Sequence, residues 1–237
     1  MNPEAEAFLR ASAPLVGSGR PARDTDLPSQ IAAALRERIQ FGDLKPGDRI
    51  REVPTAAEFD VSRGPVRDAL RILERDRIIS IEGRAGAIVR NLSVDDLRAI
   101  FEIRAELSAY NIRRAAEAPN RSAAQLDALQ AGASVLAAIA GSSEASVSDY
   151  IQVRRRLGEL VSRLSGNDYV GRIMLEFERE IAVPWAGVFD KPRQKTSSAA
   201  WRRIARAVRR GDGPAAEDEG RRIVLDSLEA LLKRRMA

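Results

Sequence analysis

Three arginines follow one another at four-residue spacing in the N-terminal half, within VSRGPVRDAL (61–70) and the residue after it. Arg63, Arg67 and Arg71 would lie on one side of a helix, because residues four apart are neighbours on a helical surface. A guanidinium is planar and can donate two parallel hydrogen bonds to guanine O6 and N7, or to a phosphate. These residue types at this spacing therefore predict the binding of an anionic partner.

The residues around the arginines predict the start of a helix that runs from Ser62 to about Asp76. Pro65 suits the first turn, because the N–H that it lacks has no partner there in any helix. Ser62 would cap the helix through its hydroxyl, and the small Gly64 would allow a duplex backbone to come close. The other side of the helix carries four apolar residues at core spacing: Val66, Ala69, Leu70 and Leu73. We expect the guanidinium groups to point outward and not to pair with the protein's own carboxylates.

The composition narrows the chemistry that this chain can perform. The 237 residues carry a formal net charge of +5, which suits an anionic partner. Residues 1–91 hold 15 Arg and Lys against 14 Asp and Glu, so an anion-binding surface there must come from arrangement. The chain has no Cys and no His, which excludes disulfides, thiolate and imidazole catalysis, and the usual zinc and iron sites. We predict no catalytic residue and no cofactor.

Two further expectations concern enzyme activity and location. An enzyme that uses paired carboxylates such as Glu176 and Glu180 is an alternative, but their spacing is typical of a solvated helix. No uninterrupted apolar run approaches 18 residues, and the N-terminus lacks an apolar signal core. We therefore expect a cytoplasmic protein that is not an enzyme and has no membrane partner.

The order of elements predicts two domains after an N-terminal tail. Residues 1–26 show no sustained period, so we expect a flexible tail. Over 27–91 the pattern gives a helix at 28–41, a short extended piece near 50, a helix at 55–59, the helix at 62–76 and a β-hairpin at 78–89. This is the order of a winged helix-turn-helix, in which the second helix of the motif enters the major groove. Arg84, at the hairpin tip, would reach the minor groove or phosphates.

The remainder, 92–237, shows only helical periods. The predicted helices are 94–117, 122–140, 147–164, 168–188, 197–210 and 214–235. We expect an all-α antiparallel bundle of about six helices, so the fold class is mainly α.

The first of these domains resembles the DNA-binding domain of GntR-type bacterial transcription regulators. The resemblance covers GDLKPGDRIREVPTAAEFDVSRGPVRDALRILERDRIISIEGRAGAIVRNLS (42–93). Thr55 and Asp60 stand where the family usually has Leu and often has Gly. The resemblance implies DNA contacts by Arg63 and Arg67. Together with position and spacing, it gives the predicted DNA-binding set: Ser62, Arg63, Gly64, Arg67, Arg71 and Arg84.

The second domain resembles the FCD effector domain of the FadR-type subfamily, through LSVDDLRAIFEIRAEL (92–107), LSGN (164–167) and IARAVRRGD (204–212). The subfamily usually binds a divalent metal through one Asp and three His. The corresponding positions here are Arg154, Gly158, Trp201 and Ile223. None of these side chains is a metal ligand, so we expect no metal.

Two cations and an indole would instead face the bundle interior. Arg104 and Arg154 lie on apolar stripes, and a buried arginine needs an anionic or carbonyl partner. With Trp201 they predict a pocket for a small organic acid. In the alternative, Arg154 faces water within the run RRR (154–156), and side chains fill the space that holds the metal in the subfamily. The domain would then only dimerise or recruit a partner. The favoured hypothesis is a homodimeric repressor that binds double-stranded DNA at a pseudo-palindromic operator and responds to that acid.

Overall fold

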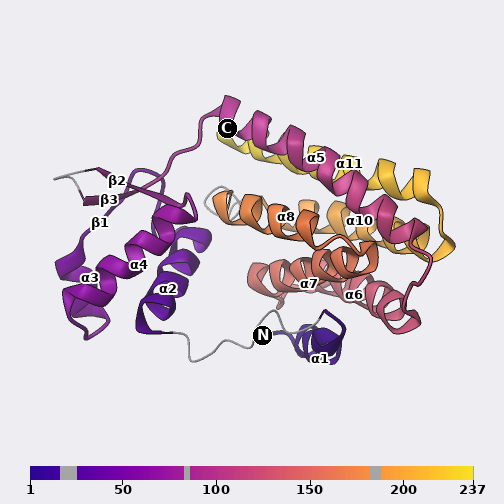
Figure 1. Ribbon diagram of the computed structural model, residues 1–237, viewed down its shortest axis with the longest axis horizontal. Helices are drawn as coiled ribbons and strands as arrows, with labels where there is room; N and C mark the ends of the chain where they lie inside the picture. The colour runs from indigo at the N-terminus through magenta and orange to yellow at the C-terminus, as the bar shows by residue number, and fades with distance from the viewer. Residues whose placement is uncertain (17–25, 83–85, 182–187, 237) are drawn as a thin grey trace. The chain divides into compact units, whose positions relative to one another are not determined.

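The computed structural model describes residues 1–16, 26–82, 86–181 and 188–236. The described chain is mainly helical, with one small sheet, as predicted (Figure 1). It divides into two compact units, and the divisions fall after Leu97 in helix α5 and after Met174 in helix α8. One unit contains helices α2 to α4 and the three strands, and the other contains most of the remaining helices.

The first unit is a winged helix-turn-helix, which confirms the predicted fold of this region. Its helices are α2 (Leu27–Phe41), α3 (Glu52–Glu58) and α4 (Arg63–Arg75). The strands β1 (Arg49–Ile50), β2 (Ile79–Glu82) and β3 (Gly86–Val89) form an antiparallel sheet in the order β1-β3-β2. The hairpin register places Ile79 opposite Val89.

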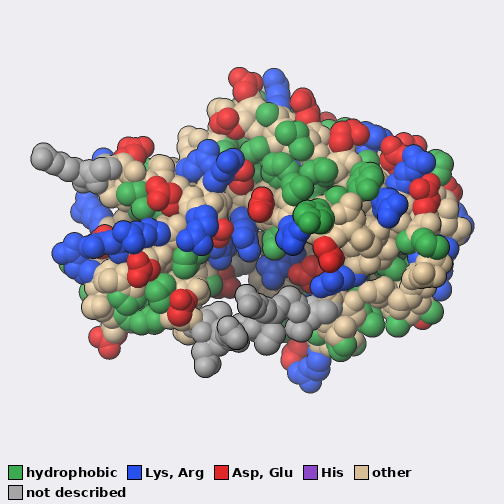
Figure 2. Space-filling model, viewed as in Figure 1, with side chains coloured by type: hydrophobic (Ala, Val, Ile, Leu, Met, Phe, Trp, Pro, Cys, Tyr) green, Lys and Arg blue, Asp and Glu red, His purple; other side chains and the backbone are tan. Residues whose placement is uncertain are grey.

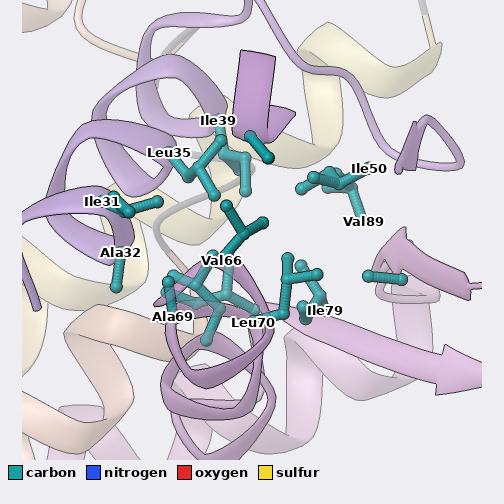
Figure 3. Close-up of a cluster of buried hydrophobic side chains, with 14 residues drawn as sticks. Ile31, Ala32, Leu35, Ile39, Ile50, Val66, Ala69, Leu70, Ile79 and Val89 are labelled. Carbon is teal, nitrogen blue, oxygen red and sulfur yellow. The ribbon is translucent and has the colours of Figure 1, made fainter. Parts of the chain in front are cut away.

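A single apolar core holds α4 against α2 and the sheet (Figure 3). The four predicted core residues of α4 are all buried. They pack in one cluster with Ile31, Leu35 and Ile39 of α2 and with Ile79 and Val89 of the hairpin. Each fully buried aliphatic side chain stabilises the fold by about 1.5–3 kcal/mol relative to exposure. The core therefore fixes which side of α4 remains at the surface.

The turn that precedes α4 explains one departure from the family pattern. Asp60, where the family often has Gly, adopts a left-handed backbone with φ of 52°. Asp tolerates this region better than most residues, because its short polar side chain can hydrogen-bond locally. The turn therefore keeps its conformation without glycine.

Six helices among the described residues form the bundle, close to the predicted boundaries, and the bundle shares its compact unit with residues 1–16. They are α5 (Val94–Glu117), α6 (Ala123–Gly141), α7 (Val147–Ser165), α8 (Asp168–Glu180), α10 (Lys191–Arg210) and α11 (Gly213–Met236). Helix α10 begins six residues before its predicted start, because Asp190 caps it by accepting a hydrogen bond from the N–H of Arg193. Pro192 lies in its first turn, where proline is tolerated. Most of the predicted extension of α8, 182–187, lies outside the described residues.

The prediction of a flexible tail over residues 1–26 is wrong for its first part. Residues Pro3–Ser12 form helix α1, and Ala13–Leu15 form a short 3₁₀ helix, η1. The side chain of Asn2 caps α1 by accepting from the N–H groups of Glu4 and Ala5. Helix α1 packs on α6 and α7 and buries Phe8. The segment 17–25 lies outside the described residues.

Helix α6 is long and apolar enough, by length and composition, to cross a membrane. It packs against α7, α10 and α1, and residues along it, such as Leu129 and Leu136, are fully buried. Ala131, Ser134 and Ala138 on another side of the helix are exposed, so α6 packs on the bundle through one side.

Candidate nucleic-acid interface and bundle interior

The arginines of α4 lie at the surface, on the side away from the core. The side chains of Arg63, Arg67 and Arg71 are 61, 51 and 65% exposed. Figure 2 shows Lys and Arg side chains in a row over α3 and α4. The predicted separation of an apolar side and a cationic side is confirmed, because the core residues at 66, 69, 70 and 73 are buried.

The expectation that these guanidinium groups do not pair with the protein's carboxylates is wrong: Arg71 pairs with Asp68, and Glu52 binds the other two. Glu52, in the first turn of α3, accepts hydrogen bonds from both Arg63 and Arg67. Oε2 lies 3.0 Å from Nη2 of Arg63, and Oε1 lies 2.9 Å from Nε of Arg67. The helix-turn-helix packs α3 beside α4, which brings a residue 11 and 15 positions away into contact.

The hydrogen bonds of this cluster favour the charged forms of Glu52 and Arg67. Hydrogen bonds from Arg67 first, and then from Arg63, lower the pKa of Glu52 from 4.5 to about 2. The same carboxylate raises the pKa of Arg67. Glu52 is therefore ionised at neutral pH, and the cluster of Glu52, Arg63 and Arg67 carries a net charge of +1.

The other predicted DNA-binding residues are Ser62, Gly64, Arg71 and Arg84. Ser62 is the N-cap residue of α4 by backbone conformation, but its side chain makes no capping hydrogen bond, so the predicted cap is wrong. Its hydroxyl is exposed, as is Gly64. Arg71 lies one turn further along α4 and pairs loosely with Asp68 at 3.6 Å. Arg84 lies outside the described residues.

In the bundle, Arg104 faces inward as predicted. Its side chain is 2% exposed, and its guanidinium carbon lies 5.0 Å from the ring centroid of Phe101 on the same helix, α5. A cation over an aromatic face is attracted by the negative potential of the ring, and the attraction is stronger away from water.

Of the three arginines in the run RRR (154–156) of α7, one is exposed and two are partly buried. Arg154 is half-buried, with its guanidinium carbon 5.4 Å from the ring centroid of Phe189. Arg155 is exposed and pairs with Glu159. Arg156 donates to the carbonyl of Leu9 and the hydroxyl of Ser12 in α1. The reading in which the whole run faces water therefore holds for Arg155 alone.

Trp201 is buried in α10, as its position predicts. It is 5% exposed, and its indole Nε1 is a buried donor that has no hydrogen-bond partner in the described part of the chain. A Cβ built at Gly158 of α7 would meet no atom within 4 Å, so there is open space beside this helix. The four metal-ligand positions of the subfamily therefore hold other groups here. They are a cation, a glycine beside open space, an indole donor without a partner and an aliphatic side chain, at Arg154, Gly158, Trp201 and Ile223 respectively.

Sequence reasoning missed Arg193, in the first turn of α10. It is 8% exposed, and its Nη2 donates to the carbonyl of Ile223 at 3.2 Å and to Oγ of Ser227 at 2.6 Å. Burial lowers the pKa of Arg193. Burial also raises the pKa of Tyr150, and a hydrogen bond with Ser197 and the charges of Arg154 and Arg193 oppose that rise. The predicted helix starts at residue 197, so the sequence pattern gives Arg193 no helical face.

The fold and these sites define a DNA-binding regulator with a helical domain joined to a winged helix. The family model for bacterial regulatory proteins of the gntR family matches residues 27–89, and the FCD domain model matches residues 99–226. The chain belongs to the GntR family and carries an FCD domain. It is a DNA-binding transcription regulator, and members of this family regulate transcription rather than catalyse reactions.

Curated relatives match about a third of the chain. The gluconate operon transcriptional repressor of Bacillus subtilis is 40% identical over 85 residues, which are 36% of this chain and 35% of that protein. The mannosyl-D-glycerate transport/metabolism system repressor of Escherichia coli is 46% identical over 68 residues, 28% of each chain. The chain thus spans about a third of the length of the curated relatives it matches.

Solved structures resemble the chain over most of its length. The structure of E. coli McbR/YncC has a TM-score of 0.75 at 19% identity and covers 89% of this chain and 99% of that one. A transcriptional regulator from Rhodococcus sp. RHA1 has a TM-score of 0.68 at 21% identity, over 87% of this chain and 97% of that one. At these identities the similarity establishes the fold.

Proposed function

We propose that this protein is a cytoplasmic, homodimeric repressor that binds a pseudo-palindromic operator and is controlled by a small organic acid in its helical domain. DNA contact is assigned to Ser62, Arg63, Gly64, Arg67 and Arg71, with Arg84 at the hairpin tip. The observation that carries this assignment is the exposed cationic side of α4, which is held in place by an apolar core on the other side. The second helix of a helix-turn-helix presents this surface to the major groove.

Substitution of Arg67 tests the DNA assignment. Arg67→Ala should strongly weaken specific operator binding and leave the fold intact, because the side chain is half-exposed and belongs to no core. Loss of one bidentate contact to guanine costs about 1–3 kcal/mol of discrimination, or roughly 5- to 150-fold in affinity. Fluorescence anisotropy with a duplex selected by the wild-type protein from a random pool measures it. Unchanged affinity for that duplex would contradict the assignment.

The repressor and dimer assignments rest on two separate supports. Both of the curated relatives named above are repressors of operons or transport systems. Exposed apolar side chains on α5 and α8 suit a second copy of the chain. They are Ile103 and Tyr110 of α5 and Tyr169 and Ile173 of α8. Two winged helices in a dimer would match the two halves of a palindrome.

A small organic anion is the ligand that the bundle interior supports best. The ring of Phe189 lies 5.4 Å from the ring of Tyr150 and 5.4 Å from the guanidinium carbon of Arg154. The phenol of Tyr150 donates to the carbonyl of Gln194, the residue after Arg193. Arg104 and Trp201 are buried, and Trp201 has an unused donor. A buried donor without a partner costs free energy that a ligand acceptor would recover. A carboxylate would offer such acceptors and neutralise part of the charge.

A divalent metal does not fit these residues. Arg154, Gly158, Trp201 and Ile223 provide no oxygen, thiolate or imidazole ligand in their side chains. Over the described ranges, no group of three or more Asp, Glu, His or Cys residues is placed to hold a metal ion. The proposed acid is therefore bound by direct contacts with cations and donors.

One observation favours a second candidate function, a helical domain that dimerises without an effector. The terminal nitrogens of Arg193 already donate three hydrogen bonds, to the hydroxyls of Thr196 and Ser227 and to the carbonyl of Ile223. In this reading the arginine joins α10 to α11, and the bundle needs no ligand.

Titration calorimetry of the full-length protein against a panel of carboxylic acids separates the two. The effector proposal predicts binding heat for at least one acid, which is weakened by Arg104→Ala and by Trp201→Phe. The second substitution keeps an aromatic ring and removes only the indole donor. Arg155→Ala is the matched control, because Arg155 is an exposed neighbour of Arg154. An absence of heat for every acid, with operator binding intact, favours the second candidate.

A further inference from the structure

Glu52 joins the two arginines that are assigned to DNA contact. Its Oε2 accepts from Nη2 of Arg63 at 3.0 Å and from Nη2 of Arg67 at 3.1 Å, and its Oε1 accepts from Nε of Arg67 at 2.9 Å. Nε of Arg63 lies 3.3 Å from Oε2. One carboxylate thus binds one edge of each guanidinium.

These hydrogen bonds leave a defined part of each arginine for a ligand. They use Nε and Nη2, and in the described part of the chain Nη1 of Arg63 and of Arg67 takes no part in them. A guanidinium has five N–H donors in one plane. When a carboxylate holds the edge with Nε, the edge formed by the two terminal nitrogens remains for a bidentate contact with guanine O6 and N7.

We propose that Glu52 is a positioning residue that determines DNA specificity, because it fixes the direction of Arg63 and Arg67 and neutralises part of their charge. This inference rests on the proposed function of the two arginines as DNA contacts. Holding the side chains before binding reduces the rotamer entropy that is lost when the complex forms. This smaller entropy loss favours only those duplexes in which a guanine lies where the fixed guanidinium groups point. It gives no advantage to an arbitrary duplex.

The charge of Glu52 acts on non-specific binding in the opposite direction. Non-specific DNA binding depends on cations that neutralise phosphates and release counterions. With Glu52 the cluster carries +1, and without it the cluster would carry +2. Glu52 therefore weakens the attraction to phosphates that every sequence shares and leaves the directed contacts in place.

An acidic residue in the first turn also favours helix formation by itself, and this explanation predicts a different result. The same helix provides the matched control. Glu58, in the last turn of α3, pairs with Arg38 at 2.8 Å and is 52% exposed. Glu58→Gln removes the same charge from the same helix without touching the cluster of Glu52, Arg63 and Arg67.

The experiment compares wild type, Glu52→Gln and Glu58→Gln as full-length proteins. Each is titrated with the selected duplex and with a scrambled duplex of equal length, over a series of salt concentrations. For Glu52→Gln we expect the ratio of specific to non-specific affinity to fall about tenfold, which is within the discrimination of one bidentate contact. Its affinity for the scrambled duplex should rise, with a salt slope steeper by ~0.9 for one more neutralised phosphate. Glu58→Gln should leave the ratio unchanged.

The outcomes separate this inference from the proposed function. A wild-type protein that binds both duplexes equally would overturn the DNA assignment itself. A wild-type protein that discriminates, with a Glu52→Gln variant that discriminates equally well, would overturn the role of Glu52 alone. The same holds if Glu58→Gln lowers the ratio as much as Glu52→Gln does. Far-ultraviolet circular dichroism establishes that each variant is folded.

Discussion

The winged helix exposes its key arginines to solvent, whereas the bundle buries its own. In the winged helix, Arg63 and Arg67 are more than half exposed, and one carboxylate holds them at the surface. In the bundle, Arg104 and Arg193 are almost fully buried, against an aromatic ring and against carbonyl and hydroxyl oxygens. The exposed pair can contact an external anion through its remaining donors at little cost, because its side chains are already exposed to water.

The buried arginines are in a different position, because they cannot return to water without opening the bundle. A buried cation must be compensated inside the protein or by a ligand that enters it. The comparison therefore indicates that the winged helix uses arginine to meet a large external partner, whereas the bundle uses arginine to hold its own helices or a small enclosed molecule.

The largest expected effect is a difference in stability between a buried-arginine variant and an exposed-arginine variant. Arg104→Ala should lower the free energy of unfolding by about 2–5 kcal/mol, because it removes a long, buried side chain and its packing on Phe101. Arg67→Ala should change it by less than about 0.5 kcal/mol, as is usual at exposed positions. Urea unfolding of both variants measures the difference. Equal losses in the two variants would remove the distinction between the units.

Packing of α1 on the bundle gives the next effect. A Cβ at Gly132 would lie 2.5 Å from the ring of Phe8 and 2.6 Å from Cδ2 of Leu157. Gly132→Ala should therefore lower the free energy of unfolding by about 1–3 kcal/mol through overpacking. Gly141→Ala, on the same helix, meets no atom within 4 Å and should be neutral, or stabilising by about 0.5–1 kcal/mol.

A double variant tests whether Phe8 is the cause. In a Phe8→Ala background, Gly132→Ala should cost less stability than it does in the wild type, because the ring that the new methyl group would strike is gone. If Gly132→Ala and Gly141→Ala unfold at the same urea concentration, α1 is not packed on the bundle in this way.

The smallest expected effect is on stability, at the two serines that precede α7 and α4. Ser146 caps α7 in a reciprocal capping box with Asp149, whereas Ser62 makes no capping hydrogen bond. Ser146→Ala should cost about 1 kcal/mol of stability, and Ser62→Ala less than about 0.3 kcal/mol. Thermal unfolding of both variants is the measurement. A cost at Ser62 as large as that at Ser146 would show that its hydroxyl caps α4 in solution.

Much of the fold could be predicted from local patterns. Apolar residues at helical spacing located α2, α4 and the six bundle helices, and the hairpin followed from alternation around Gly83 and Gly86. The starts of α1 and α10 were not predicted. Pro3 and Pro192 each lie in the first turn of one of these helices, after the capping residues Asn2 and Asp190. Pro65 lies in the first turn of α4 in the same way.

The candidate site could be predicted only in part, because its partners are tertiary. The spacing of Arg63 and Arg67 predicts their common face, but no local pattern indicates that Glu52 binds both. Arg193 and Ser227 are likewise 34 residues apart and meet only when α10 packs on α11. Sequence periodicity predicts which face a residue occupies, and the fold decides which residue stands opposite.

The central claim is that Arg67 meets a guanine edge, and it is tested most directly by removing one atom from the DNA. Replacing guanine by 7-deazaguanine in each half of the selected duplex removes the N7 acceptor. For the wild-type protein, affinity should fall roughly tenfold or more at the contacted guanine. For Arg67→Ala the same replacement should have no effect, because the donor is already absent. An equal loss of affinity in both proteins would contradict the account.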